Sequence, residues 1–324
     1  MRKAGRSVKM KLCAWLLVPV AAFAGFSSLA NAQNSELDAL RTLALELVNE
    51  ARAKEGLPAL KLEAKLNEAS LGHARDMLAR NYYAHESPEG KTVSDRFQAA
   101  GGSKWLLTAE NIAKCDGCAP PLTRDHVRQM QDGWMNSPGH RANILRKGLE
   151  TFGFGMTVNG GGTLYAVQNF AGPGTPHGDG KAADLRPISP EKQLDIVLEA
   201  INQRRKAAGV TPLEPSFALS EGARKLAPDP GDADFKVEGG GNIYDSLAGD
   251  EQKNWATLTV LTVSCGGCGV DPVKADVADF AGRWLEHPEY GAMLSSAEVT
   301  HIGFAMVADG KGRKLGVGLI GEHR

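Results

Sequence analysis

The chain has 324 residues, of which 42% are hydrophobic, 6% aromatic and 23% charged. These fractions are ordinary for globular proteins and exclude a disordered, collagen-like or coiled-coil chain. Its 37 Lys and Arg residues against 38 Asp and Glu residues give a formal charge of −1. We therefore expect no nucleic-acid partner, because proteins that bind nucleic acid usually carry a basic surface. At roughly 150 residues per domain, the length predicts about two domains.

Residues 1–32 have the features of a secretory signal peptide. Five Lys and Arg residues precede an apolar run at 12–26, and Ala30-Asn31-Ala32 offers small residues at both positions of a cleavage site. We predict cleavage before Gln33 and export to the periplasm or the extracellular space. No later segment approaches the roughly 20 apolar residues that a membrane-spanning helix needs, so no transmembrane segment is expected in the mature chain.

The mature chain contains two copies of one unit. Its rarest residues reappear at an offset of 150 positions, in four pairs: Trp105 and Trp255, Trp134 and Trp284, Cys115 and Cys265, Cys118 and Cys268. Nearer the start the offset is 153, because Asn49 and Arg52 match Asn202 and Arg205. Such self-similarity indicates a tandem repeat. A Gly- and Pro-rich linker is expected at 174–188, between a first domain at 34–173 and a second at 189–324.

Each copy has the same predicted order of elements. In the first, apolar residues recur at helical spacing between 40 and 51, and further helices are expected at about 66–80 and 124–135. Two strand-like runs follow, at 152–158 and 163–170. Asn159-Gly160 between them is a strong hairpin signal, which the second copy repeats as Asp309-Gly310. Helices followed by a terminal hairpin predict a mixed α/β sandwich and not a doubly wound nucleotide-binding fold.

Three polar residues of the first copy, His85, Glu110 and His140, lie in short segments outside the main periodic stretches. Two imidazoles and one carboxylate can bind a catalytic zinc ion and leave one position open for water. The same three residues can act without metal, as a general base and the carboxylate that orients it. Each can also be structural. The spacing of 25 and 30 residues does not choose among these interpretations.

Six motifs of the first copy occur in order between residues 49 and 170: Asn49-Glu50-Ala51-Arg52, Ala84-His85-Glu86-Ser87-Pro88, Ala109-Glu110-Asn111-Ile112, Trp134-Met135-Asn136-Ser137-Pro138-Gly139-His140-Arg141, Phe152-Gly153-Phe154-Gly155 and Gln168-Asn169-Phe170. Together they resemble the CAP superfamily of cysteine-rich secretory, antigen-5 and pathogenesis-related proteins, and most closely its bacterial branch. The resemblance implies tandem α-β-α sandwich domains with an antiparallel sheet. It also implies a cleft with two histidines and two acidic residues, three of which match His85, Glu110 and His140. Ser137 stands where the family's second acid would be, so no complete tetrad is expected.

The second copy departs from the family at these positions. Val260 stands opposite Glu110, Tyr290 stands opposite His140, and no histidine lies near the counterpart of His85. The tryptophans and the hairpin signal remain. We therefore predict a degenerate CAP-like domain that has lost the polar site and is retained for packing or for binding through another surface.

The two CxxC pairs, Cys115/Cys118 and Cys265/Cys268, have three interpretations. Local disulfides suit an exported protein, because oxidising compartments favour them. Four thiolates are also the ligand set of a zinc site that the two copies would share. A thioredoxin-like redox role needs a helix that begins at the first cysteine, whereas Pro120-Pro121 follow the first pair. We favour local disulfides.

The leading hypothesis is an exported tandem CAP protein whose first domain binds a ligand, or a divalent metal such as zinc, in the His85/Glu110/His140 cleft. The resemblance links different family members to lipid or sterol binding, peptidase activity and antimicrobial action, so the expected partner is a small ligand, a lipid or an envelope component. One alternative is a metal-assisted hydrolase of peptides or envelope polymers, although the sequence has no Gly-x-Ser-x-Gly or His-Glu-x-x-His motif. Another is a protein-interaction module without catalysis. No catalytic residue is assigned, since one fold supports many functions.

Overall fold

The computed structural model describes residues 23–177, 185–237 and 241–324. The positive segment and most of the apolar run of the predicted signal peptide lie outside these residues, so cleavage and export stay predictions. No helix in the described ranges is long and apolar enough to cross a membrane.

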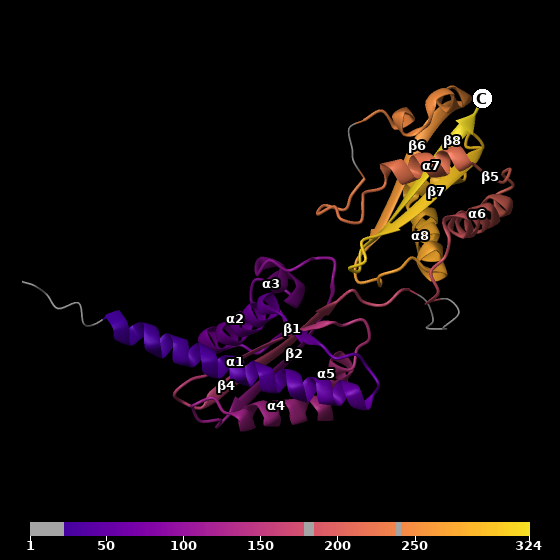
Figure 1. Cartoon of the computed structure of the whole chain (residues 1–324). Coiled ribbons are helices and arrows are strands. Elements are labelled where there is room, and N and C mark those ends of the chain that lie inside the picture. The colour runs from indigo at the N-terminus through magenta and orange to yellow at the C-terminus, as the bar shows by residue number, and fades with distance from the viewer. Residues whose placement is uncertain (1–22, 178–184, 238–240) are drawn as a thin grey trace, which may run out of the picture.

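The first repeat is a four-stranded sheet with helices on both faces (Figure 1). Its elements are α1 (Phe23–Lys54), β1 (Lys61–Leu62), α2 (Ala64–Arg80), α3 (Val93–Ala99), β2 (Leu107–Asp116), α4 (Arg124–Asn136), α5 (Pro138–Ile144), β3 (Thr151–Val158) and β4 (Thr163–Gly172). The strand order is β1-β3-β4-β2. Helix α2 packs against β3 and β4, and α1 and α4 share a hydrophobic core with the other face of the sheet.

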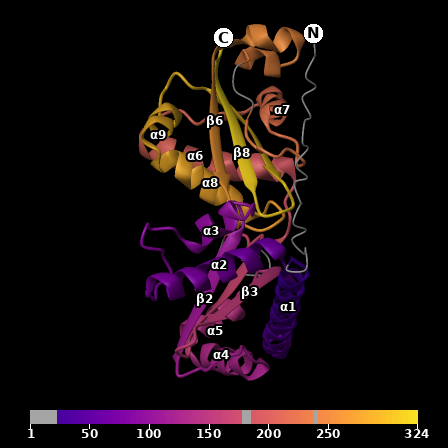
Figure 2. The same ribbon diagram turned by 90° about the vertical axis from the view of Figure 1, so that its left-hand side faces the viewer.

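The second repeat has the same architecture. Its elements are α6 (Pro190–Ala207), β5 (Glu214–Pro215), α7 (Phe217–Leu226), the 3₁₀ turns η2 (Ile243–Ser246) and η3 (Gly249–Asn254), β6 (Trp255–Cys265), α8 (Lys274–Glu286), α9 (Pro288–Leu294), β7 (His301–Ala308) and β8 (Lys314–His323). The strand order is β5-β7-β8-β6. The two repeats lie end to end (Figure 2). The prediction of tandem α-β-α sandwiches is therefore confirmed.

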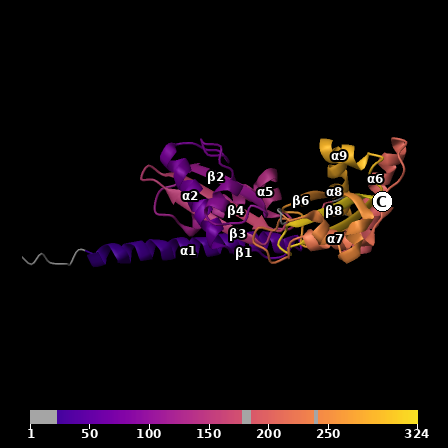
Figure 3. The same ribbon diagram turned by 90° about the horizontal axis from the view of Figure 1, so that it is seen from above.

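Two details differ from the sequence prediction. Each sheet is antiparallel except for a two-residue first strand, β1 or β5, which pairs in parallel with β3 or β7. Helix α1 begins at Phe23, before the periodic stretch, and its N-terminal part projects beyond the rest of the repeat (Figure 3). Its buried apolar residues begin at Leu40. Apolar periodicity indicates which residues of a helix are buried, so it predicts only the part of α1 that packs against the rest of the repeat.

A buried arginine stabilises the turn after the first helix of each repeat. Arg52 is 1% exposed and donates from Nε to the Pro58 carbonyl at 2.9 Å and from Nη1 to the Ile144 carbonyl at 2.9 Å. The matched Arg205 is also 1% exposed and donates to the Leu294 carbonyl at 2.8 Å. The bonds to Ile144 and Leu294 are buried, and these two carbonyls would otherwise lack this donor, so the shared arginine is structural.

Two matched glycines allow a helix to pack directly on a strand. A Cβ atom at Gly153 would lie 2.2 Å from the backbone carbon of Leu66 on α2, and one at Gly303 would lie 2.1 Å from the backbone nitrogen of Ser220 on α7. No side chain fits at such distances. The Phe-Gly-Phe-Gly motif therefore sets the spacing between helix and sheet.

Both CxxC pairs form local disulfides, Cys115–Cys118 and Cys265–Cys268, with Cα–Cα distances of 5.8 and 6.2 Å. The local pairing is confirmed. The four sulfur atoms are bonded in pairs, so the alternative of a four-thiolate zinc site shared between the copies is wrong for this structure.

The second disulfide lies at the junction of the repeats. Gly269 donates its backbone N–H to the Pro173 carbonyl at 2.8 Å, and Cys268 forms a β-bridge with Gly174. A Cβ atom at Gly266 would lie 2.7 Å from the carbonyl oxygen of Trp105, so the disulfide loop also approaches the first repeat closely.

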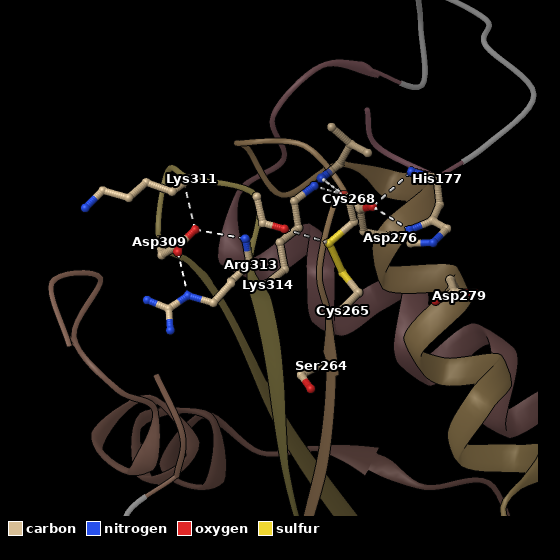
Figure 4. Close-up of a disulfide and its surroundings, with 12 residues drawn as sticks. His177, Ser264, Cys265, Cys268, Asp276, Asp279, Asp309, Lys311, Arg313 and Lys314 are labelled. Atoms are coloured by element: carbon tan, nitrogen blue, oxygen red, sulfur yellow. Dashed lines mark hydrogen bonds and ion pairs between the residues drawn. A yellow bond between two sulfur atoms is a disulfide. The ribbon is translucent and has the colours of Figure 1, made fainter. Parts of the chain in front are cut away.

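A buried ion pair beside this disulfide anchors the start of the linker (Figure 4). Asp276 and Lys314 are each 0% exposed and pair with one another. Asp276 Oδ1 also accepts from the backbone N–H of His177 at 3.2 Å and lies 3.3 Å from His177 Nδ1. The linker is thereby attached to the second repeat.

We expect loss of the second disulfide to loosen this junction and loss of the first to leave it intact. Each bond closes a small ring, so removing either one should lower stability by less than the roughly 3 kcal/mol expected for a 15-residue loop. Small-angle X-ray scattering should show a larger radius of gyration for the C265S/C268S variant. The matched C115S/C118S variant should keep the wild-type value. An equal change in both variants would contradict the assignment.

Candidate functional site

Glu110 is the centre of a polar cluster in the first repeat. It lies within β2 and is 5% exposed. Its Oε1 atom lies 2.9 Å from His85 Nδ1, and its Oε2 atom lies 2.5 Å from Arg96 Nη2 on α3. Asn169, its partner across the sheet on β4, donates to Oε2 at 3.1 Å when its amide nitrogen faces the carboxylate. Both carboxylate oxygens are therefore engaged.

His73 on α2 holds the loop that carries His85. Its ring is buried, and Nε2 lies 3.0 Å from the Ala84 carbonyl and 4.0 Å from Glu110 Oε1. Burial lowers the pKa of His73, which favours the neutral ring. A neutral His73 that carries its proton on Nε2 donates it to the Ala84 carbonyl and so fixes the residue before His85.

Two asparagine amides attach the segment of His140 to the same strand. Asn111 Nδ2 donates to the His140 carbonyl at 3.1 Å, and Asn143 Nδ2 donates to the Glu110 carbonyl at 3.0 Å. Asn143 also donates to Asn111 Oδ1 at 3.0 Å. The Glu-Asn motif thus places a carboxylate on one face of β2, and on the other face an amide that positions α5.

The two histidines titrate in opposite directions. The hydrogen bond that His85 donates to the Glu110 carboxylate raises the pKa of His85, whose side chain is 57% exposed. Burial lowers the pKa of His140, and the nearby charge on His85 lowers it further. His85 therefore holds a proton to higher pH than His140, and its exposed Nε2 is the outward end of the Glu110–His85 pair.

A groove of about 420 Å³ is lined by His140 but not by Glu110 or His85; we call it the first-repeat groove. It lies between β2 and α4, and its lining includes Tyr83, Lys114, Met130, Trp134 and His140. Met130 and Trp134 belong to the hydrophobic core. One side of the groove is therefore apolar, and the other has polar groups.

The cluster as arranged does not supply three ligands for a metal ion. Both oxygens of Glu110 are engaged, and within the described ranges no group of three or more His, Cys, Asp or Glu residues is placed to hold a metal. A metal ion here would have His85 Nε2 and His140 as its protein ligands. Glu110 would orient His85 from outside the coordination sphere, as carboxylates often do.

The second repeat replaces this cluster with apolar side chains. The repeat offsets give three replacements: Leu226 for His73, Val260 for Glu110 and Leu319 for Asn169. All three replacements pack in one hydrophobic cluster. The prediction that the second copy lacks the polar site of the first is therefore consistent with its packing.

Sequence analysis missed His73, Arg96 and Asn169. Comparison of the two copies could have indicated His73 and Asn169, because leucine stands at the matched position of each in the second copy. Arg96 carries no such signal, since the segment between α7 and β6 has diverged. It is brought to Glu110 only by the packing of α3.

The comparisons with known proteins point to one family. The sequence profile described as "Cysteine-rich secretory protein family" (CAP) matches residues 45–170 and 198–320. The Bacillus subtilis proteins named "Uncharacterized protein YkwD" and "Uncharacterized membrane protein YlbC" are each 32% identical over 126 residues, which is 39% of this chain. The chain spans 46% and 32% of the length of these two relatives.

Solved structures of similar proteins include an extracellular SCP-domain protein from Bacillus anthracis. It is 31% identical, with a TM-score of 0.34 and coverage of 41% of this chain and 40% of that chain. Na-ASP-1 is 10% identical, with a TM-score of 0.36 and coverage of 89% and 90%. The family profile matches both repeats and most of the chain, so the chain belongs to the cysteine-rich secretory protein (CAP) family.

Proposed function

We propose that this protein is exported and that its first repeat binds a small amphipathic ligand in the first-repeat groove. The observation that carries this proposal is the mixed lining of the groove, in which His140 accompanies the apolar Met130 and Trp134. His85, held by Glu110, lies near enough to His140 for its charge to lower the pKa of His140. The ligand's polar head would contact His140 and extend toward His85, and its apolar body would lie against Met130 and Trp134.

The charges favour a head group that is anionic or accepts hydrogen bonds. Arg96 offsets the charge of Glu110, so protonated His85 leaves the cluster with a net positive charge. Lys114 lines the groove, although it pairs with Asp116 at 2.9 Å. A carboxylate or phosphate accepts from such donors, and hydrogen bonds that involve charged groups are the stronger ones.

The cluster lacks one requirement of covalent catalysis by a serine, threonine or cysteine. The Glu110–His85 contact has the form of a base and its orienting carboxylate, which could activate water, but a hydroxyl or thiol nucleophile would also have to lie within hydrogen-bond reach of the base. Among the described residues, no Ser, Thr or Cys side chain is hydrogen-bonded to His85. Ser137 lines the first-repeat groove without such a contact.

The proposal is tested by calorimetric titration with octanoate, a carboxylate with an apolar chain. We expect saturable binding that weakens about tenfold or more in H85A, since a charged hydrogen bond is lost. Affinity should fall as pH rises through the pKa of His85. Octanol should bind more weakly, and R128A, on the exposed surface of α4, should match the wild type. If octanoate does not bind while zinc binds at micromolar concentration and is lost in H85A, the site is a metal site and the proposal is wrong.

A further inference from the structure

The second repeat has a groove of its own, although it has lost the cluster around Glu110. This second-repeat groove has a volume of about 350 Å³ and is lined by residues that include Thr262, Ser264, Arg283, Trp284, His287 and Tyr290. At the offset of 150 positions, Trp284, His287 and Tyr290 correspond to Trp134, Ser137 and His140, which line the first-repeat groove. The second repeat therefore retains a groove at the matched position, but the side chains that line it are different.

One buried donor of this groove lacks a partner. Trp284 is 1% exposed, and its Nε1–H finds no hydrogen-bond acceptor in the part of the chain that the structure describes. The matched Trp134 donates to the Ile112 carbonyl at 3.0 Å. A buried donor without an acceptor is unfavourable, so a ligand acceptor would be favoured here once the side chains that cover Nε1 move aside to admit it.

Further donors come from α8 and α9. Arg283 uses Nη1 to bind the Ser264 carbonyl at 3.0 Å and lies 3.6 Å from Asp279, which leaves most of its five N–H groups for other contacts. His287 Nδ1 accepts from the backbone N–H of Tyr290 at 3.4 Å. A neutral His287 therefore carries its proton on Nε2 and is a donor there. Its ring stacks on that of Tyr290, with 4.4 Å between centroids.

We propose that the second-repeat groove binds a small aromatic carboxylate. A carboxylate is an acceptor only, which suits a groove lined by Arg283, His287 and the indole of Trp284. The bidentate geometry of the guanidinium group also matches a carboxylate. An aromatic ring would pack against the stacked rings of His287 and Tyr290. This site is separate from the Glu110 cluster and does not depend on the function proposed for the first repeat.

The test is a titration of the full chain with benzoate, monitored through the indole N–H resonance of Trp284 in NMR spectra. The W284F variant assigns this resonance. We expect a saturable shift of this resonance, with an affinity about tenfold lower in R283M because the charged hydrogen bonds are lost. Benzyl alcohol, which lacks the carboxylate, should cause no comparable shift. H85A should bind benzoate as the wild type does, which separates this site from the first-repeat groove.

The proposal would be overturned if the Trp284 resonance did not move at saturating benzoate or if R283M bound benzoate as tightly as the wild type. It would also be overturned if benzyl alcohol shifted the resonance as strongly as benzoate does. Loss of the shift in H85A would also count against it, because the ligand would then occupy the other repeat.

Discussion

Replacement of Glu110 by alanine is expected to destabilise the protein by about 3 kcal/mol or more, since it leaves a largely buried cation without its carboxylate. The Arg96 side chain is 11% exposed, and its Nε atom has no acceptor among the described residues. Only the bond from Nη1 to the Lys91 carbonyl would remain for Arg96. The measurement is urea unfolding at pH 7, which gives the free energy of unfolding of each variant.

The matched control is E89A. Glu89 also accepts from an arginine, Arg80, but both side chains lie at the surface, where ion pairs contribute little. We expect E89A to unfold close to the wild type. If E110A and E89A lose the same stability, Glu110 does not organise a buried cluster.

The stability lost in E110Q should also depend on pH. In the folded protein the hydrogen bond that His85 donates to Glu110 raises the pKa of His85. A raised pKa contributes stability below the unfolded pKa of about 6.5, and this contribution disappears as pH rises through the folded pKa. The difference in unfolding free energy between wild type and E110Q should therefore be larger at pH 5.5 than at pH 8.

Replacement of Arg52 by methionine is expected to destabilise the protein by about 1–3 kcal/mol, because the buried Ile144 carbonyl is left without its donor. Arg52 donates to the carbonyls of Pro58, Ile144 and Arg146. Thermal unfolding should show the loss as a lower melting temperature.

The repeat supplies the matched variants for this prediction. R205M should destabilise the second repeat in the same way, because Arg205 makes the equivalent contacts. R128M, at an exposed arginine of α4, should leave the melting temperature nearly unchanged. Equal melting temperatures for R52M and R128M would show that the buried arginine is dispensable.

Most of the fold was predictable because the sequence contains two copies of it. The tryptophan and cysteine offsets locate the repeats, and Asn159-Gly160 locates the hairpin at the β3–β4 turn, where Asn159 Oδ1 accepts from the backbone N–H of Thr163. The strand β1 was not predictable, since two residues are too few to show alternation.

The site was predictable only in part. His85 and Glu110 are in contact, as the family motifs implied, but Arg96 neutralises the carboxylate and changes what the cluster can bind. The spacing of His85, Glu110 and His140 along the sequence cannot reveal Arg96. The approach of Arg96 to Glu110 depends on how α3 packs. The second-repeat groove was not predictable either, because Arg283 and His287, which stand opposite Gly133 and Ser137, belong to no family motif and are brought together only by the fold.

The most direct test of the central claim is a pH titration of the His85 and His140 ring resonances by NMR in the wild type and in E110Q. The claim is that Glu110 organises the cleft around His85. It predicts a pKa above the ordinary value of about 6.5 for His85 and below it for His140. It also predicts a lower pKa for His85 in E110Q than in the wild type. A wild-type His85 pKa at or below the ordinary value, or one that E110Q leaves unchanged, would contradict the claim.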